Sequence, residues 1–478
     1  MSVTSERAIL PGPFAPPGVG HRWQGLQMLS DQIGFFVRMQ RRYGEICSWA
    51  KNDQKFINIY GPRYNRLLLS DPETFVIDAF REHHLPVGSS FERLTLSLMR
   101  LNGNAHQRHR KMIQPAFRTY QLERYRQIIV DETDRFLAGW QPGESRQLDE
   151  DFLKLVTLIS MRTMFGMEAE TDGERLVALI KQLIRQFSSP LILLLPFNVP
   201  GLPFRAILDT TDKIERFVMD AIERKRADLD RYDDVLAEMM KARDETGSGF
   251  TNEELVAHAY TILCQEAAAS ALLWTFFLLD CHPDVYRRVA AEIDEKLHGA
   301  PPGMNDLKEL TYLDRVLKEA LRLFPSSPFG LRYAVRDCTL GDHDLKKGTG
   351  IFFSSYVTHR MPEIFENPLA FDPDRWTSAA CSPFEYLPFG AGAHHCIGQG
   401  LALVELKVIL AMILQRFMVR LQPKTRIDLT VKISLVPKQG LAAVLRRREA
   451  GHDGTVPEIS GNVLSAVIVS GSTAIEGS

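Results

Sequence analysis

The chemistry of this sequence is concentrated around one cysteine. Cys396 lies in the stretch FGAGAHHCIGQGLALVELK, beside Gly390, Gly392 and Gly398. Because glycine has no side chain, backbone amides can approach the sulfur closely here. A helical pattern starts next to the cysteine, at residues 397–417, and the free N–H groups and dipole of a helix N-terminus stabilise a thiolate and lower its pKa. A lone cysteine is usually a small buried residue, but a thiolate in this setting suits axial ligation of a haem iron.

A second pattern lies upstream, in the stretch KEALR. Its Glu319 and Arg322 are three residues apart, which is the spacing of an ordinary ion pair on one helix face. Pro-Asp-Arg-Trp, at residues 373–376, stands between this pair and the cysteine. Taken alone, the pair would be interpreted as a routine helical contact.

Together these stretches resemble the signatures of the cytochrome P-450 family. The F-x-x-G-x-x-x-C-x-G signature is matched by Phe389, Gly392, Cys396 and Gly398. The E-x-x-R signature is matched by Glu319 and Arg322, and Pro-Asp-Arg-Trp resembles the family's P-E-R-F, with Asp374 and Trp376 substituted. Two independent patterns in the right order make the resemblance specific.

The resemblance covers about residues 10–448 and implies a mainly α fold. A large triangular helical domain packs beside a smaller β-rich region near the N-terminus. Residues 1–20 are then a Pro- and Gly-rich lead-in and 21–448 the catalytic domain. The Gly- and Ser-rich tail 449–478 is expected to be mostly disordered, although residues 463–469 (VLSAVIV) could form a strand if they had a partner. The resemblance also implies haem b (iron protoporphyrin IX), with Cys396 as the axial ligand.

The resemblance assigns two further groups of residues. Glu319, Arg322 and Arg375 correspond to a buried charged triad, which would be structural and would fix the loop that carries Cys396, because a buried arginine needs a carboxylate partner. Cationic and His donors suit the haem propionates, and the positions that correspond to haem contacts are His106, Arg110, Arg332, His394, Phe389, Gly390 and Gly398.

One position departs from the family pattern. The long helix should carry an acid followed by Thr at the oxygen site, and this sequence has Gln265, Glu266 and then Ala267. We take these three residues as the catalytic candidates, with Glu266 as the acid. Because an Ala side chain cannot donate a hydrogen bond, three interpretations stay open. A substrate hydroxyl or ordered water replaces the Thr; the enzyme runs a shortened cycle such as peroxide-driven oxidation, radical coupling or isomerisation; or the protein only binds haem or another ligand, as a gas sensor would.

These residues need helices and short strands to position them. Residues 251–281 form one long helical pattern, with Thr251 and Glu254 as a capping box, and His282-Pro283 ends it. Helical patterns also cover residues 121–140 and 206–241. By contrast, residues 56–69 predict two short strands around a Gly-Pro turn. The apolar segment 188–204 contains four prolines and is either a packed surface loop or a mobile lid over a hydrophobic pocket.

Composition excludes several classes of protein. The 478 residues are 45% hydrophobic and 24% charged with a net charge of −2, which is typical of a globular protein without a global field for nucleic acid. Six cysteines without a C-x-x-C pair indicate neither a zinc site nor a thioredoxin-like dithiol. No signal peptide is visible at the start. Residues 259–279 are apolar, but Gln265 and Glu266 lie among them, so a buried helix is favoured over a membrane span and a cytoplasmic location is expected.

The sequence therefore predicts a monooxygenase that oxidises an apolar small molecule such as a terpenoid, lipid or aromatic metabolite. Pocket candidates by resemblance are residues 85–98, 261–268, 327–331 and 435–438. Electrons would come from NAD(P)H through a ferredoxin or flavodoxin and its reductase. Basic residues such as Arg108, Lys111 and Lys407 are candidates for the docking face, with solvated surface charge as the simpler interpretation.

Overall fold

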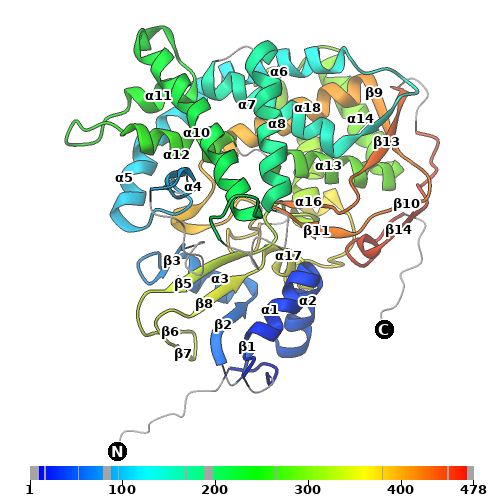
Figure 1. The fold of residues 1–478 in the computed structure, drawn as a ribbon. Coiled ribbons are helices and arrows are strands. Elements are labelled where there is room, and N and C mark those ends of the chain that lie inside the picture. The colour runs from blue at the N-terminus through cyan, green and yellow to red at the C-terminus, as the bar shows by residue number, and fades with distance from the viewer. Residues whose placement is uncertain are drawn as a thin grey trace, which may run out of the picture.

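The fold comes from a computed structural model of the chain. It describes residues 10–15, 18–51, 53–78, 88–94, 96–166, 169–187, 197–263, 266–378, 380–448 and 452–470. In Figure 1 the helices gather in the broad upper part of the molecule, and the largest sheet lies below them, with the N-terminus at the bottom. This arrangement confirms the predicted mainly α fold with a smaller β-rich region.

The helical part is built from nine long helices among the described residues. These are α6 (Thr119–Leu137), α7 (Leu148–Phe165), α8 (Ala169–Phe187), α10 (Pro203–Arg226), α12 (Asn252–Leu263), α13 (Glu266–Cys281), α14 (Pro283–Leu297), α16 (Thr311–Leu323) and α18 (Gln399–Arg416). Every α13 side chain except that of Ala267 is buried, and the indole of Trp274 stacks on Phe324 with the ring centroids 4.2 Å apart. α13 is therefore a core element around which the others pack.

The predicted helix 251–281 is seen as α12 and α13, because residues 264–265 lie outside the described part. Its capping box is confirmed: the N–H of Thr251 donates to Glu254 Oε2 at 2.8 Å, and the N–H of Glu254 donates to Thr251 Oγ1 at 3.2 Å. By length and composition Asn252–Cys281 could cross a membrane, but 87% of its most apolar window is buried inside the protein. Its apolar surface is thus already covered by protein.

The large sheet has the strand order β1 (Ile46–Ala50), β2 (Asp53–Ile59), β8 (Gly350–Phe353), β5 (Gly330–Ala334) and β3 (Phe75–Val76). Only the β2–β8 pair is parallel. The prediction of a second strand after β2 is wrong, because α3 (Gly61–Leu69) follows directly. Pro62 occupies the first turn of α3, where its fixed φ suits a helix start and its missing N–H costs nothing.

The predicted helix over 206–241 is interrupted. α10 ends at Arg226, and α11 (Val235–Lys241) starts anew after Asp234, whose carboxylate accepts the N–H of Ala237 and pairs with the buried Lys225. Of the apolar segment 188–204, residues 188–196 lie outside the described part. Phe197 and Val199 are exposed, which fits either interpretation of this segment.

The tail is packed where the structure describes it, unlike the mostly disordered tail that its composition indicates. β14 (Ile459–Ser460) pairs with β10 (Thr425–Arg426), and Val463 and Ala466 are fully buried. The N–H of Ile468 donates to the carbonyl of Leu369 at 2.9 Å. Residues 449–451 and 471–478 lie outside the described part. The tail is ordered because apolar residues scattered among Gly and Ser find partners distant in sequence.

Candidate functional site

Cys396 sits on a tight loop just before α18. Its N–H donates to the carbonyl of Phe389 at 2.9 Å, and Gly398 is the N-cap of α18. A Cβ atom on Gly398 would lie 4.0 Å from the Cys396 sulfur, so this glycine keeps the space beside the sulfur open. Gly390 and Gly392 serve the turn itself, with φ of +70° and +72°. At Gly392 a Cβ would also collide with the backbone carbonyl of Leu69.

The pKa of the Cys396 thiol is set by two opposing influences. The Cys396 side chain is exposed, yet burial by the surrounding protein raises the pKa of the thiol above its usual value. The N–H of Gly398 and the charge of Arg110 lower that pKa, as expected for a helix start, but desolvation outweighs them. The prediction of a lowered pKa is therefore wrong for the thiol in this structure.

Four cationic or imidazole side chains gather close to this loop. The rings of His106 and His394 lie with centroids 4.1 Å apart, and Arg110 Nη1 donates to the carbonyl of His395 at 2.7 Å. Burial, followed by the positive charges of His394, Arg110 and Arg332, lowers the pKa of His106 to about 4. The predicted contacts His106, Arg110, Arg332 and His394 thus share one electrostatic environment.

Neither arginine has an acidic partner among the described residues. Arg332 Nη1 donates only to the carbonyl of Leu331 at 3.0 Å, and burial lowers the pKa of its guanidinium to about 10. Arg110 is likewise desolvated, and its pKa is lowered, with Cys396 as the opposing influence. Both arginines are half-buried, and a partly desolvated cation without a counter-ion is costly, so this cluster suits an anion.

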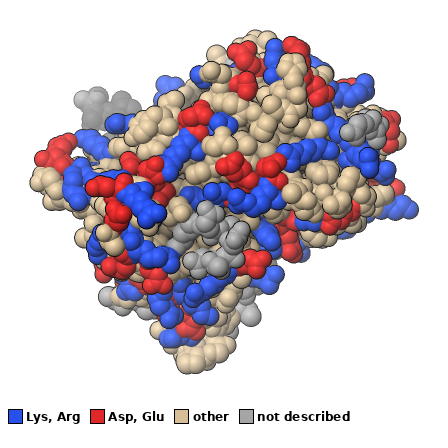
Figure 2. Space-filling view, turned by 90° about the horizontal axis from the view of Figure 1, so that it is seen from above, with Lys and Arg blue, Asp and Glu red and all other residues tan. Residues whose placement is uncertain are grey.

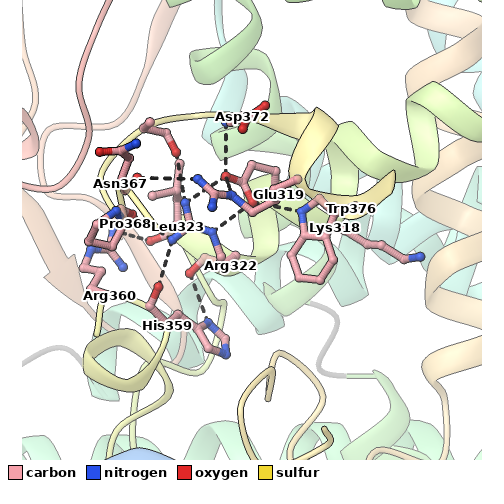
Figure 3. Close-up of polar contacts among 12 residues, drawn as sticks. Lys318, Glu319, Arg322, Leu323, His359, Arg360, Asn367, Pro368, Asp372 and Trp376 are labelled. Carbon is pink, nitrogen blue, oxygen red and sulfur yellow. Dashed lines mark hydrogen bonds and ion pairs between the residues drawn. The ribbon is translucent and has the colours of Figure 1, made fainter. Parts of the chain in front are cut away.

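The predicted charged triad forms, with Glu319 and Arg322 fully buried. Figure 3 shows these two side chains together with Trp376. Arg322 donates twice to the Glu319 carboxylate, Nε to Oε2 at 2.9 Å and Nη2 to Oε1 at 2.8 Å. Arg375 Nε adds a third hydrogen bond, to Oε1 at 2.8 Å. Trp376 donates its indole N–H to Oε2 at 2.9 Å, so the residue that replaces the family's Phe satisfies the same carboxylate.

The triad reaches the Cys396 loop through a residue that the sequence analysis missed. His359 is fully buried, its Nδ1 lies 3.0 Å from the carbonyl of Arg322, and the N–H of Leu387 donates to its Nε2 at 2.8 Å. Tyr386 adds a second link, since its hydroxyl donates to the carbonyl of Lys318 at 3.0 Å. The local sequence around His359, SSYVTHRMP, gives no signal for this role, because a histidine among polar and apolar residues is common in ordinary proteins.

Glu266, the predicted acid, is the first residue of α13. Its carboxylate accepts the backbone N–H groups of Ile433 and Ser434, and Oε2 has no hydrogen-bond partner among the described residues. Burial raises the pKa of Glu266 to about 7, against the lowering influence of Lys432 and of these two N–H groups. Glu266 therefore contacts the turn between β11 (Leu429–Val431) and β12 (Leu435–Pro437). Gln265 lies outside the described residues.

Comparison with known proteins identifies the family. A family model described as Cytochrome P-450 matches residues 11–443. The chain belongs to the cytochrome P-450 family. Its P-450 relatives include cyclooctat-9-en-7-ol 5-monooxygenase of Streptomyces melanosporofaciens, which is 34% identical over 69% of this chain and 74% of that protein. Pentalenene oxygenase of Streptomyces avermitilis is 31% identical over 66% of this chain and 72% of that protein.

The P-450 fold is matched by a solved structure as well. Retinoic acid bound cyanobacterial CYP120A1 superposes with a TM-score of 0.80 and 25% identity, over 92% of this chain and 100% of that chain. The protein is accordingly a P-450 monooxygenase with haem b as its cofactor.

The three basic residues suggested for partner docking in this P-450 are already paired. Arg108 binds Asp244 at 2.6 Å, Lys111 binds Glu245 at 3.3 Å, and Lys407 binds Asp314 at 2.6 Å. Seen from above, basic and acidic side chains are intermixed over the whole face (Figure 2). These pairings favour the simpler interpretation of the three residues as surface charge.

Proposed function

We propose that this P-450 inserts one oxygen atom from O2 into an apolar small molecule of the terpenoid class. The balance is RH + O2 + 2e− + 2H+ → ROH + H2O, with electrons delivered from NAD(P)H by a separate ferredoxin or flavodoxin in the cytoplasm. The relatives named for cyclooctat-9-en-7-ol and pentalenene support this substrate class. A lipid or an aromatic metabolite is the alternative substrate.

The observation that carries the proposal is an accessible cysteine close to two half-buried arginines that lack an acidic partner among the described residues. Haem carries carboxylates, and His106, Arg110, Arg332 and His394 suit them chemically. The Cys396 thiol forms no disulfide and is exposed, so it can serve as a ligand to iron. When bound, haem supplies the one-electron and O2 chemistry, and the protein supplies its ligand, its orientation and a dry surrounding.

Glu266 is the acid that we assign to proton delivery. It is buried, one carboxylate oxygen is unpaired, and its raised pKa keeps a proton available near neutral pH. The next residue, Ala267, has an exposed side chain, but this side chain carries no hydroxyl. The absent hydroxyl favours a second candidate function, oxidation driven by hydrogen peroxide, which needs neither a redox partner nor proton delivery to O2.

The first experiment is the absorption spectrum of the reduced protein with carbon monoxide, for wild type and Cys396→Ser. We expect a strongly red-shifted Soret band that the substitution abolishes. A spectrum that the substitution leaves unchanged would refute thiolate ligation by Cys396. Product formation from a panel of terpenoids is then measured in two reactions. One contains 18O2, NAD(P)H and a surrogate ferredoxin system, and the other contains hydrogen peroxide alone. Incorporation of 18O that requires NAD(P)H supports the monooxygenase, and turnover with peroxide alone supports the second candidate.

A further inference from the structure

Ala267 is the position at which the proposed oxygen chemistry needs a hydroxyl and the sequence supplies a methyl group. Its side chain is exposed, whereas the side chains of Glu266 and Ala268 on either side are buried. This turn of α13 therefore presents Ala267 to open space and not to packed protein. Because a methyl group neither donates nor accepts a hydrogen bond, a hydroxyl at this turn has to come from another element.

Ser326 brings a hydroxyl to that turn. Its Oγ donates a hydrogen bond to the backbone carbonyl of Ala267 at 2.7 Å, and its side chain is buried. It stands in the segment that follows α16, three residues after the helix ends at Leu323. A hydroxyl has one donor and two acceptor sites. The donor is engaged, and none of the described residues donates a hydrogen bond to Ser326 Oγ, so it can accept a proton.

A closed network fixes Ser326 in this place. The N–H of Leu435 donates to the carbonyl of Ser326 at 2.9 Å. The carbonyl of Leu435 in turn accepts Ser270 Oγ at 2.6 Å and the Trp274 indole N–H at 2.8 Å. Ser270 and Trp274 both belong to α13, so Ser326, β12 and α13 hold one another. The hydroxyl is thus positioned relative to Ala267 before any substrate binds.

We propose that Ser326 supplies the hydroxyl that residue 267 lacks and passes protons to the oxygen site beside Ala267. This inference rests on the proposed monooxygenase function. For this the Ser326 hydroxyl turns its one hydrogen from the Ala267 carbonyl toward the oxygen site. Oγ then accepts a proton at a lone pair, from water or from Glu266, as it releases the hydrogen that it carried. One O–H bond forms as another breaks, and the serine is unchanged. Two such transfers accompany the two electrons from the redox partner. If Ser326 does not direct these protons, the same electrons leave by O2 + 2e− + 2H+ → H2O2, with the protons taken from solvent.

A purely structural hydroxyl is the competing explanation, and the same segment offers one for comparison. Ser355 Oγ donates to the carbonyl of Ser327, the neighbour of Ser326, at 2.7 Å, and Ser355 is also buried. Both hydroxyls anchor the segment by the same kind of bond, but only that of Ser326 bonds to the turn that carries Ala267. Ser355→Ala is therefore the matched control for Ser326→Ala.

The first measurement is independent of turnover. It is the C–O stretching frequency of carbon monoxide bound to the reduced haem enzyme, which falls when a hydroxyl donates a hydrogen bond to the ligand. We expect the frequency to rise in Ser326→Ala, and to stay at the wild-type value in Ser355→Ala and in Ser326→Thr, which keeps the hydroxyl.

The second measurement is the yield of product and of H2O2 per NAD(P)H consumed, in H2O and in D2O. We expect Ser326→Ala to lower product formation on the order of 100-fold, the scale of one positioned proton-transfer group, and to divert the electrons to H2O2. The wild type should show a solvent isotope effect that Ser326→Ala changes. Ser326→Thr and the double variant Ser326→Ala/Ala267→Thr should recover the yield.

Two results would overturn the inference. If Ser326→Ala and Ser355→Ala lose the same amount of product yield, Ser326 only anchors the segment after α16. If Ser326→Ala leaves both the product yield and the C–O frequency unchanged, Ser326 has no role at the oxygen site. A wild type without O2-dependent product would refute the monooxygenase function instead. The C–O frequency would then still decide whether Ser326 reaches the ligand site.

Discussion

His359 accepts the backbone N–H of Leu387 at Nε2, 2.8 Å away, and donates from Nδ1 to the carbonyl of Arg322, 3.0 Å away. Nε2 can accept only if it carries no proton, so this ring is a neutral imidazole with its hydrogen on Nδ1. The carbonyl of Leu387 next accepts the N–H of Gly390. The buried charged triad therefore holds the Cys396 loop through one uncharged ring.

Replacing His359 is expected to disturb the Cys396 loop first. His359→Ala leaves the Leu387 N–H and the Arg322 carbonyl without partners, at about 1–3 kcal/mol for each buried group. We expect weaker haem retention and a partial loss of the thiolate-type Soret band of the carbon monoxide complex. His359→Gln keeps an acceptor and a donor and should restore the band. Identical spectra for wild type and His359→Ala would show that the loop holds its own shape.

The buried His359 ring predicts how the stability of the folded protein depends on pH. Burial lowers the pKa of His359 to about 3, from a usual value near 6.5. The unfolded chain then binds a proton that the folded protein excludes, so stability falls as pH drops below about 6.5, by up to about 1.4 kcal/mol per pH unit, until about pH 3. Denaturant unfolding of His359→Gln from pH 7 to 4 should show a shallower slope than wild type. Equal slopes would assign acid sensitivity to other groups.

Removing the carboxylate of the triad should be much more damaging than removing an exposed one. Glu319→Gln leaves Arg322, whose side chain is 0% exposed, without its counter-ion, which costs about 3–5 kcal/mol. Asp374→Asn is the control, because Asp374 pairs with Arg288 through side chains that are 47% and 52% exposed. Such pairs contribute about 0–1 kcal/mol. Similar melting temperatures for the two variants would contradict this ranking.

Arg332 should have opposite effects on the haem-free and haem-loaded protein. Its half-buried, desolvated guanidinium lacks an acidic partner among the described residues, so Arg332→Leu should leave the haem-free protein equally or more stable. The same variant should release haem faster to apomyoglobin, because a propionate loses its cation. Arg332→Lys, which keeps the charge, should retain haem longer than Arg332→Leu. Lower stability of haem-free Arg332→Leu would mean that the arginine serves the fold alone.

The tail should be required for the stability of the whole domain. Val463, Val467 and Val469 are buried at 0%, 2% and 4% exposure, and burying each valine contributes about 1.5–3 kcal/mol. A chain that ends at residue 451 is therefore expected to melt at a lower temperature and to lose haem. A chain that ends at residue 470 is the control and should behave like wild type. Equal melting temperatures for the two would mean that the tail is dispensable.

Local patterns predicted the reactive residues, and long-range packing decided how they are connected. The glycines around Cys396 and the spacing of Glu319 and Arg322 are visible in short windows, which is why the haem-thiolate site and the family were found. The role of His359 depends on Leu387, a neighbour 28 residues away. The order of the tail depends on its contact with Leu369, which is distant in sequence. The raised pKa of Cys396 depends on desolvation by the surrounding protein. None of these has a periodic signal.

The titration of Glu266 should make both the stability of the protein and its product yield depend on pH. Because burial raises the pKa of Glu266 from 4.5 to about 7, the stabilising contribution of its protonated form is complete below about pH 4.5 and disappears as pH rises through 7. The carboxyl should also stop donating protons above pH 7, so we expect the yield of product per NAD(P)H to fall from pH 6 to pH 8. Glu266→Gln cannot titrate, and its lower yield should no longer depend on pH in this range. The free energy of unfolding of Glu266→Gln should also fall less than that of wild type between pH 5 and pH 8. A yield in Glu266→Gln that follows the wild-type pH profile would move the proton source to another group.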